Sequence, residues 1–60
     1  MLNPDTVRPG DVVTYEDRAN PLTYFVVESV NDNPWSTFEV RELDTGDRRW
    51  TDGRQRGWES

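Results

Sequence analysis

The sequence has no cysteine and no histidine among its 60 residues. Without cysteine it forms no disulfide, and without cysteine and histidine it cannot build an ordinary structural zinc site. Many small domains use these devices to supplement a small hydrophobic core. A chain of this length buries only about 60% of the surface that its unfolded form exposes, so its stability is marginal. Packing of apolar side chains, or contact with a partner, must therefore stabilise it.

Lysine is also absent, since all seven basic residues are arginine, and twelve residues are acidic. The net charge is −5 and the isoelectric point is about 4.4. This composition is similar to that of proteins from salt-loving archaea, and it also occurs in GC-rich actinobacteria and their viruses, because arginine codons are GC-rich. Molar salt screens surface charges within about 3 Å, so an acidic surface costs little in such a medium.

Long apolar runs are missing as well. No stretch approaches the roughly 20 apolar residues that span a bilayer, and the N-terminus lacks the basic and apolar regions of a signal peptide. We therefore expect a cytoplasmic protein without membrane contact. The chain is expected to be one domain over residues 1–60, with an N-terminal arm over 1–10, a barrel over 11–51 and a C-terminal Arg/Trp tail over 52–60.

A β-meander forms the centre of the chain and contains nearly all of its large apolar residues. The segments Leu22–Val30, Ser36–Leu43 and Arg48–Thr51 are rich in β-branched and aromatic residues, and tight turns separate them. A shorter strand is expected over Asp11–Glu16, after the Pro-Gly turn signal that precedes it. The tail after the meander adds either a fifth short strand or a single helical turn.

The longest of these segments, Leu22–Val30, carries apolar groups on both faces, which predicts a central strand. A bulge near Glu28 and Ser29 would bring Val30 to the buried face and turn the carboxylate to solvent. Small curved barrels need such bulges to bend. In the turn before the last meander strand, Gly46 is expected in the left-handed region of backbone conformation, as in a bulged hairpin.

Five short strands in about 50 residues are too few for two full sheets, but they can form one strongly bent barrel. The segments Pro9–Val13, Tyr24–Glu28, Phe38–Arg41 and Asp44–Gly46 resemble, in their order, the strands and turns of SH3-like small barrels of the KOW and Tudor type. The resemblance covers residues 9–51 and implies a binding module without indicating its ligand. We therefore predict an all-β fold, a single SH3-like barrel of four to five short antiparallel strands. The alternative is an open three-stranded meander that a partner covers.

The alternation of apolar and polar residues also predicts the core. Side chains two residues apart on a strand share a face, so the apolar set of each strand is expected to point inward. The predicted core residues are Val12, Phe25, Val27, Val30, Phe38, Val40, Leu43 and Trp50.

Acidic motifs offer little catalytic chemistry. Asp44-Thr45-Gly46 matches the triplet of aspartic proteases, but a small residue usually follows that triplet, and a hairpin turn explains these residues. Glu28 is the only acid within a hydrophobic run, and the usual histidine and lysine bases are missing. Calcium could bind turn residues, although the spacing of an EF-hand loop is absent; the candidates are Asp44, Asp47 and Asp52, or Asn31, Asp32 and Asn33. We expect no enzyme activity, no cofactor and no metal site.

The C-terminal region is the best candidate for a contact surface. Residues 1–47 hold ten acids and three arginines, whereas residues 48–60 hold four arginines and two acids, and such asymmetry indicates a contact surface. Arginine and tryptophan interleave there, and these residue types pair with phosphate and stack on bases. The predicted binding residues are Trp35, Arg48, Arg49, Trp50, Arg54, Arg56 and Trp58.

These residues also have structural explanations. Trp50 could pack in the core or at the barrel end, Trp58 could fold back onto the barrel, and the arginines could pair with the acidic body. We expect a non-enzymatic binding or structural module that contacts a protein partner, or a second copy, through the Arg/Trp surface. One alternative is a nucleic-acid-binding protein of the KOW type, although such domains tend to be basic. The other is a small structural component of a virion or another assembly.

Overall fold

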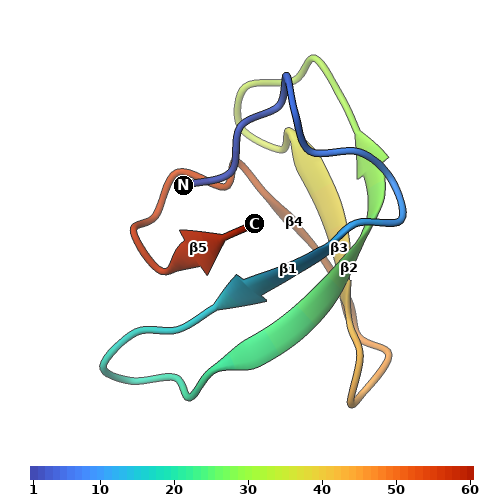
Figure 1. The fold of residues 1–60 in the computed structure, drawn as a ribbon. Helices are drawn as coiled ribbons and strands as arrows, with labels where there is room; N and C mark the ends of the chain where they lie inside the picture. The colour runs from blue at the N-terminus through green and yellow to red at the C-terminus, as the bar shows by residue number, and fades with distance from the viewer.

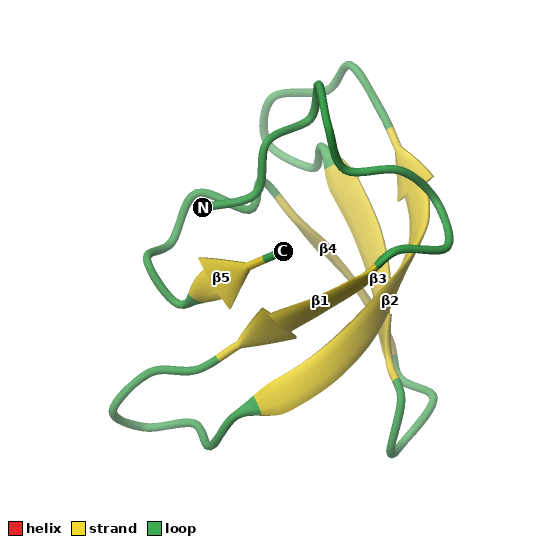
Figure 2. Ribbon diagram, in the orientation of Figure 1, coloured by secondary structure: helices red, strands yellow, loops and turns green.

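The computed structural model describes residues 1–60 and contains five β-strands without any helix. The strands are β1 (Val12–Tyr15), β2 (Thr23–Val30), β3 (Phe38–Glu42), β4 (Arg48–Thr51) and β5 (Trp58–Glu59). They form one antiparallel sheet in the order β4-β3-β2-β1-β5 (Figure 1; coloured by element type in Figure 2). The predicted all-β class is therefore confirmed. The fold offers no helix with the length and apolar character needed to cross a membrane.

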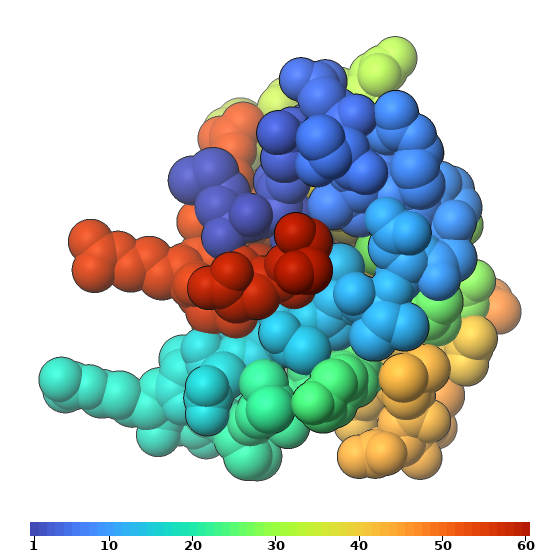
Figure 3. Space-filling model, in the orientation of Figure 1, coloured from blue at the N-terminus to red at the C-terminus, as the bar shows by residue number.

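The sheet is a meander of β2, β3 and β4, to which β1 and β5 are added on the other side of β2. β1 pairs with both β2 and β5, whereas β4 pairs only with β3. β4 and β5 are therefore the two edge strands. Both chain termini lie beside β5 (Figure 1), and the Met1 amine donates a hydrogen bond of 2.5 Å to the Trp58 carbonyl. Figure 3 shows the N-terminal arm and the C-terminal residues packed together on one face.

The predicted bulge in β2 is present. The pairing of β2 with β3 shifts register between Val27 and Ser29, so that two residues of β2 occupy the space of one. Val30 then packs against the core on the same face as Val27. Glu28 is turned to the outer face, where it accepts a hydrogen bond of 2.6 Å from the Nε of Arg41.

The hairpin turn between β3 and β4 also has the predicted conformation. Gly46 has a φ of 77°, in the region that side chains other than glycine rarely adopt. Its N–H donates to the carbonyl of Glu42 at 2.8 Å. Asp47 N–H donates to the Thr45 hydroxyl at 3.1 Å, so the Asp-Thr-Gly motif is used by the turn itself.

The hydrophobic core consists of eight buried side chains from the N-terminal arm and from every strand except β4: Leu2, Val7, Val13, Phe25, Val27, Phe38, Val40 and Trp58. The predictions for Phe25, Val27, Phe38 and Val40 are confirmed. Val30 is partly buried and packs against this cluster.

Three other core predictions are wrong, because Val12, Leu43 and Trp50 are each about half exposed. Val12 pairs with Val26 on the outer face, while its neighbour in the chain is fully buried opposite Phe25. Trp50 pairs with Glu39, whose side chain is also on the outer face. Leu43 lies just beyond the end of β3, outside the alternation of that strand.

Apart from Val13, the core residues that were not predicted come from the two ends of the chain. Leu2 is only 2% exposed, and its N–H donates to the Gly53 carbonyl at 2.8 Å. Val7 is equally buried, and Trp58 of β5 is 3% exposed. The N-terminal arm therefore closes the core beside the C-terminal tail, and it holds the loop between β4 and β5 in place.

Candidate functional site

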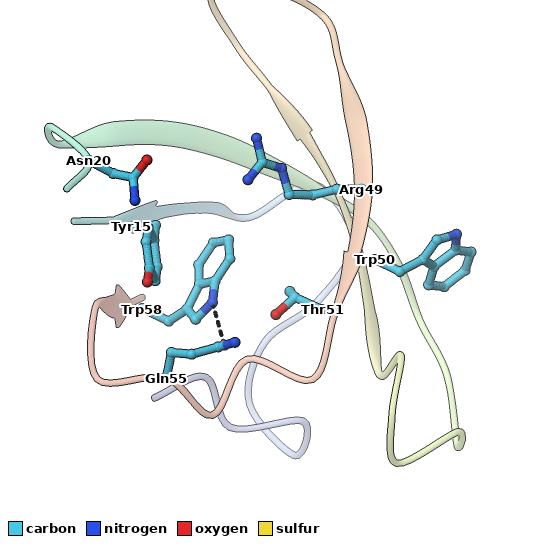
Figure 4. A pocket seen from close by; sticks show the side chains of 7 residues that line it. All are labelled: Tyr15, Asn20, Arg49, Trp50, Thr51, Gln55 and Trp58. Carbon is cyan, nitrogen blue, oxygen red and sulfur yellow. Dashed lines mark hydrogen bonds between the residues drawn. The ribbon is translucent and has the colours of Figure 1, made fainter. Parts of the chain in front are cut away.

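A pocket of about 300 Å³ lies between the two edge strands (Figure 4). Its lining comes from four segments: β1, the loop after it, β4, and β5 with the loop before it. The lining residues are Tyr15, Asn20, Arg49, Trp50, Thr51, Gln55 and Trp58. Concave sites with a few convergent polar groups are the usual location of ligand binding, so this pocket is the candidate site.

The rings of Tyr15 and Trp58 form one wall of the pocket. The Trp58 ring lies 4.9 Å from that of Tyr15 and 5.1 Å from that of Phe25, with tilted planes in both pairs. The indole Nε1 of Trp58 donates to the Oε1 of Gln55 at 3.1 Å, which satisfies the one polar group of this buried side chain. This tryptophan is therefore a fixed part of the core that presents part of its surface to the pocket.

Hydrogen bonds to Asp17 organise the rim. Its carboxylate accepts the Tyr15 hydroxyl at 2.6 Å and the side-chain amide of Asn20 at 2.8 Å, and it also accepts the backbone N–H groups of Ala19 and Asn20. The hydrogen bond from Tyr15 is the main cause that lowers the pKa of Asp17, and the bond from Asn20 is the next. The hydrogen bond between Tyr15 and Asp17 also raises the pKa of Tyr15. At neutral pH this rim therefore combines an ionised carboxylate with a protonated phenol.

Arg49 is the only charged side chain in the pocket lining. The guanidinium carbon lies 5.3 Å from the centre of the Phe25 ring, within the range of a cation–π interaction. One terminal nitrogen is 3.7 Å from a carboxylate oxygen of Glu42, which is an ion pair without a hydrogen bond. The side chain is 54% exposed, so its N–H groups are accessible to a ligand.

The main chain of β4 is open along the pocket. Glu42 N–H donates to the Asp47 carbonyl at 2.8 Å, and hydrogen-bonded and non-hydrogen-bonded pairs alternate along an antiparallel ladder. Arg49 and Thr51 therefore direct their N–H and C=O groups to β3, whereas those of Arg48 and Trp50 point away from it, to the free edge. Figure 4 shows the Trp50 indole turned away from the other pocket side chains. Trp50 thus lines the pocket with its main chain.

The structure does not bring the predicted binding residues into one surface. Arg48 and Trp50 lie on the outer face of β4, where Arg48 is 4.0 Å from Glu28. Trp35 is 79% exposed in the loop between β2 and β3, away from the pocket lining. Arg49 and Trp58 meet in the pocket.

The two remaining predicted arginines, Arg54 and Arg56, are exposed in the loop between β4 and β5, on either side of Gln55 of the pocket lining. Neither forms an ion pair. Four lining residues were not predicted, because they lie in separate parts of the chain and each is a common strand or turn residue: Tyr15, Asn20, Thr51 and Gln55. The pairing of β1 with β5 brings these residues together, and no local sequence pattern indicates this pairing.

Two of the residues considered for acid–base chemistry or calcium binding, Glu28 and Asn33, take part in hydrogen bonds within the fold. The hydrogen bond from Arg41 lowers the pKa of Glu28, whereas a general acid needs a raised one. No group of three or more acidic side chains is placed to hold a metal ion. The side-chain oxygen of Asn33 accepts the N–H of Trp35 at 2.9 Å, so this residue stabilises its own turn.

Comparison of the chain with family models, curated proteins and solved structures found no match.

Proposed function

We propose that this chain is a non-enzymatic protein-binding module that binds an extended segment of another protein along the free edge of β4. The observation that carries this proposal is the position of the open edge: the main chain of Trp50 lines the pocket, and its indole points elsewhere. A site of this kind offers main-chain hydrogen bonds and a place for one side chain.

Strand addition to a sheet edge uses these two features together. Main-chain hydrogen bonds supply affinity, and pockets for alternate side chains supply specificity. Arg48 and Trp50 each present one N–H and one C=O to the free edge, so a bound segment could make up to four main-chain hydrogen bonds. Every second side chain of that segment would face the pocket side of β4.

The charges on β4 favour a different protein over a second copy as the partner. Antiparallel pairing of two β4 strands centred on Arg49 would place the Arg49 side chains of the two copies opposite each other. Like charges opposite each other destabilise strand pairs, and charged edge residues are a common protection against self-pairing. A partner segment with acidic side chains would instead complement this edge.

The resemblance to SH3-like small barrels supports the same proposal, since it implies a binding module. The meander of β2, β3 and β4, with β1 joined to the C-terminal strand, is compatible with a small bent barrel that is open between β4 and β5. We propose that this opening is the binding side of the barrel.

Amide NMR of the ¹⁵N-labelled protein tests the proposal, with peptides selected against it from a displayed library of random dodecapeptides. We expect slowed hydrogen exchange at the amides of Arg48 and Trp50, because a bound segment would accept their N–H groups. The amides of Arg49 and Thr51 already face β3 and should change less. Selection of no peptide, or changes centred on the loop around Trp35, would contradict strand addition at β4.

Nucleic acid is the second candidate ligand, and one observation favours it. Arg54 and Arg56 are exposed beside the pocket without acidic partners, so phosphates could bind them. Against this, Trp58 is buried and packed between two rings, which leaves it little surface for base stacking. Titration with single-stranded dT12 at 50 and 200 mM salt tests this candidate, because phosphate contacts predict affinity that falls steeply with salt.

A further inference from the structure

The unused hydrogen-bonding groups of the pocket are mainly donors. The indole N–H of Trp58 can only donate, so Gln55 must present its carbonyl oxygen to it, which leaves the amide nitrogen of Gln55 free. The Thr51 hydroxyl oxygen accepts the N–H of Gly53 at 3.0 Å, and its own proton remains available.

Arg49 adds the strongest donors. Its side chain forms no hydrogen bond within the protein, since the nearest carboxylate oxygen, on Glu42, is 3.7 Å away. The guanidinium lies over the ring of Phe25, and this cation–π contact favours its position in the pocket. A planar guanidinium with free N–H groups fits a carboxylate through two parallel hydrogen bonds.

Competing acceptors are few. The carboxylate of Asp17 at the rim already accepts four hydrogen bonds, from Tyr15, Ala19 and Asn20. Asn20 keeps a carbonyl oxygen free, because its nitrogen donates to Asp17, and the Tyr15 hydroxyl oxygen can also still accept. The pocket therefore suits a group that accepts several hydrogen bonds and carries negative charge.

We infer that the pocket takes an acidic side chain, Asp or Glu, of the extended segment, and that Arg49 determines this preference. This inference rests on the proposed function, because the segment bound along β4 delivers the side chain to the pocket. Arg49 is next to Trp50, whose main chain holds the segment, so one bound strand can satisfy both groups.

Three synthetic peptides test the inference. They share the sequence acetyl-Gly-Ser-Thr-Val-Xaa-Val-Thr-Ser-Gly-amide and carry Glu, Gln or Lys at the central position. We expect the Glu peptide to bind about tenfold more tightly than the Gln peptide, the factor that one charge-assisted hydrogen bond supplies. The Lys peptide should bind most weakly, and the dissociation constants come from amide shifts.

Variants of the protein assign the preference to Arg49. Arg49→Gln should reduce the Glu-to-Gln ratio to about twofold or less, and Arg49→Lys should restore part of it, because it keeps the charge without the planar fork. Arg8→Gln removes the same charge outside the pocket and should leave the ratio unchanged. Thermal unfolding of each variant shows whether it is folded. If Arg49→Gln does not fold, the Glu-to-Gln ratio of Arg49→Lys is the test of the inference.

The possible results separate the inference from the proposed function. Equal binding of all three peptides, with amide changes at Arg48 and Trp50, would overturn the acidic preference and leave strand addition intact. Binding of none of the peptides would count against both. If dT12 binds more tightly than the Glu peptide and shifts the amide signal of Arg49, the ligand of the pocket is nucleic acid and not a protein segment.

Discussion

Replacement of Leu2 by alanine should destabilise the protein strongly, although this residue is the second of the chain. Its side chain is 2% exposed, and its N–H is bonded to the Gly53 carbonyl. Truncation of a buried leucine costs about 2–5 kcal/mol, because apolar surface is lost and a cavity remains. A domain of sixty residues has a total stability on the order of 3–9 kcal/mol, so this single change should remove a large part of it.

Leu22→Ala is the matched control, because it makes the same chemical change at a side chain that is 50% exposed. A change at such a surface position is usually within about 0.5 kcal/mol. Urea unfolding followed by circular dichroism compares the two variants. With a slope of about 1 kcal/mol per molar urea, Leu2→Ala should lower the midpoint by about 2 M or more. Equal midpoints for the two variants would refute the assignment of the N-terminal arm to the core.

Gly53→Ala should destabilise more than Gly46→Ala: both residues have positive φ, but only at Gly53 would the new Cβ lie 2.9 Å from Leu2 and Phe38 atoms. Equal urea midpoints would contradict this packing. In Asp17→Asn, the melting temperature should fall less steeply than in the parent protein as the pH is lowered into the acid range, that is, along the acid limb of the profile. Because the pKa of Asp17 is lowered from its usual 3.8, its ionised form stabilises fully above that pH and loses this effect as the pH falls through the folded-state pKa. An unchanged limb would contradict this. Trp58→Phe should weaken the buried, blue-shifted tryptophan emission, and acrylamide should then quench almost all remaining emission. A persistent protected component would contradict the burial of Trp58.

The centre of the fold could be predicted from the sequence because its strands alternate clearly. Phe38 and Val40 are the only apolar residues of β3 and fix its inward face. The excess of apolar residues in β2 required a bulge if both Val27 and Val30 were to be buried, and the structure has this bulge. The glycine of an Asp-Thr-Gly turn is likewise expected to adopt the left-handed conformation of a bulged hairpin, and Gly46 does so.

Which side chains of β1, β4 and β5 face the core could not be predicted, because the pattern of each strand is too short or ambiguous. Val12 and Val13 are adjacent and chemically identical, so only the pairing of β1 decides which of them is buried. β4 has one large apolar residue, Trp50, and its position opposite Glu39 turns it outward, whereas Trp58 of the two-residue strand β5 is buried in the core.

The site was predicted only in part for the same reason. Arg49 and Trp58 were both among the predicted binding residues, and both line the pocket. Tyr15 and Gln55 join them only because β1 pairs with β5, a contact between residues far apart in the chain. The free edge of β4 is a property of strand order, which no single segment of the sequence contains.

Binding along the β4 edge can be tested most directly by comparing Trp50→Pro with Trp50→Ala. Both variants lose the indole, but only proline removes the N–H that points to the free edge, and proline is tolerated where that N–H faces solvent. With a peptide selected on the parent protein, we predict that Trp50→Ala retains binding and that Trp50→Pro weakens it by about tenfold or more, while both variants remain folded. Equal affinity of the two folded variants would contradict strand addition at β4.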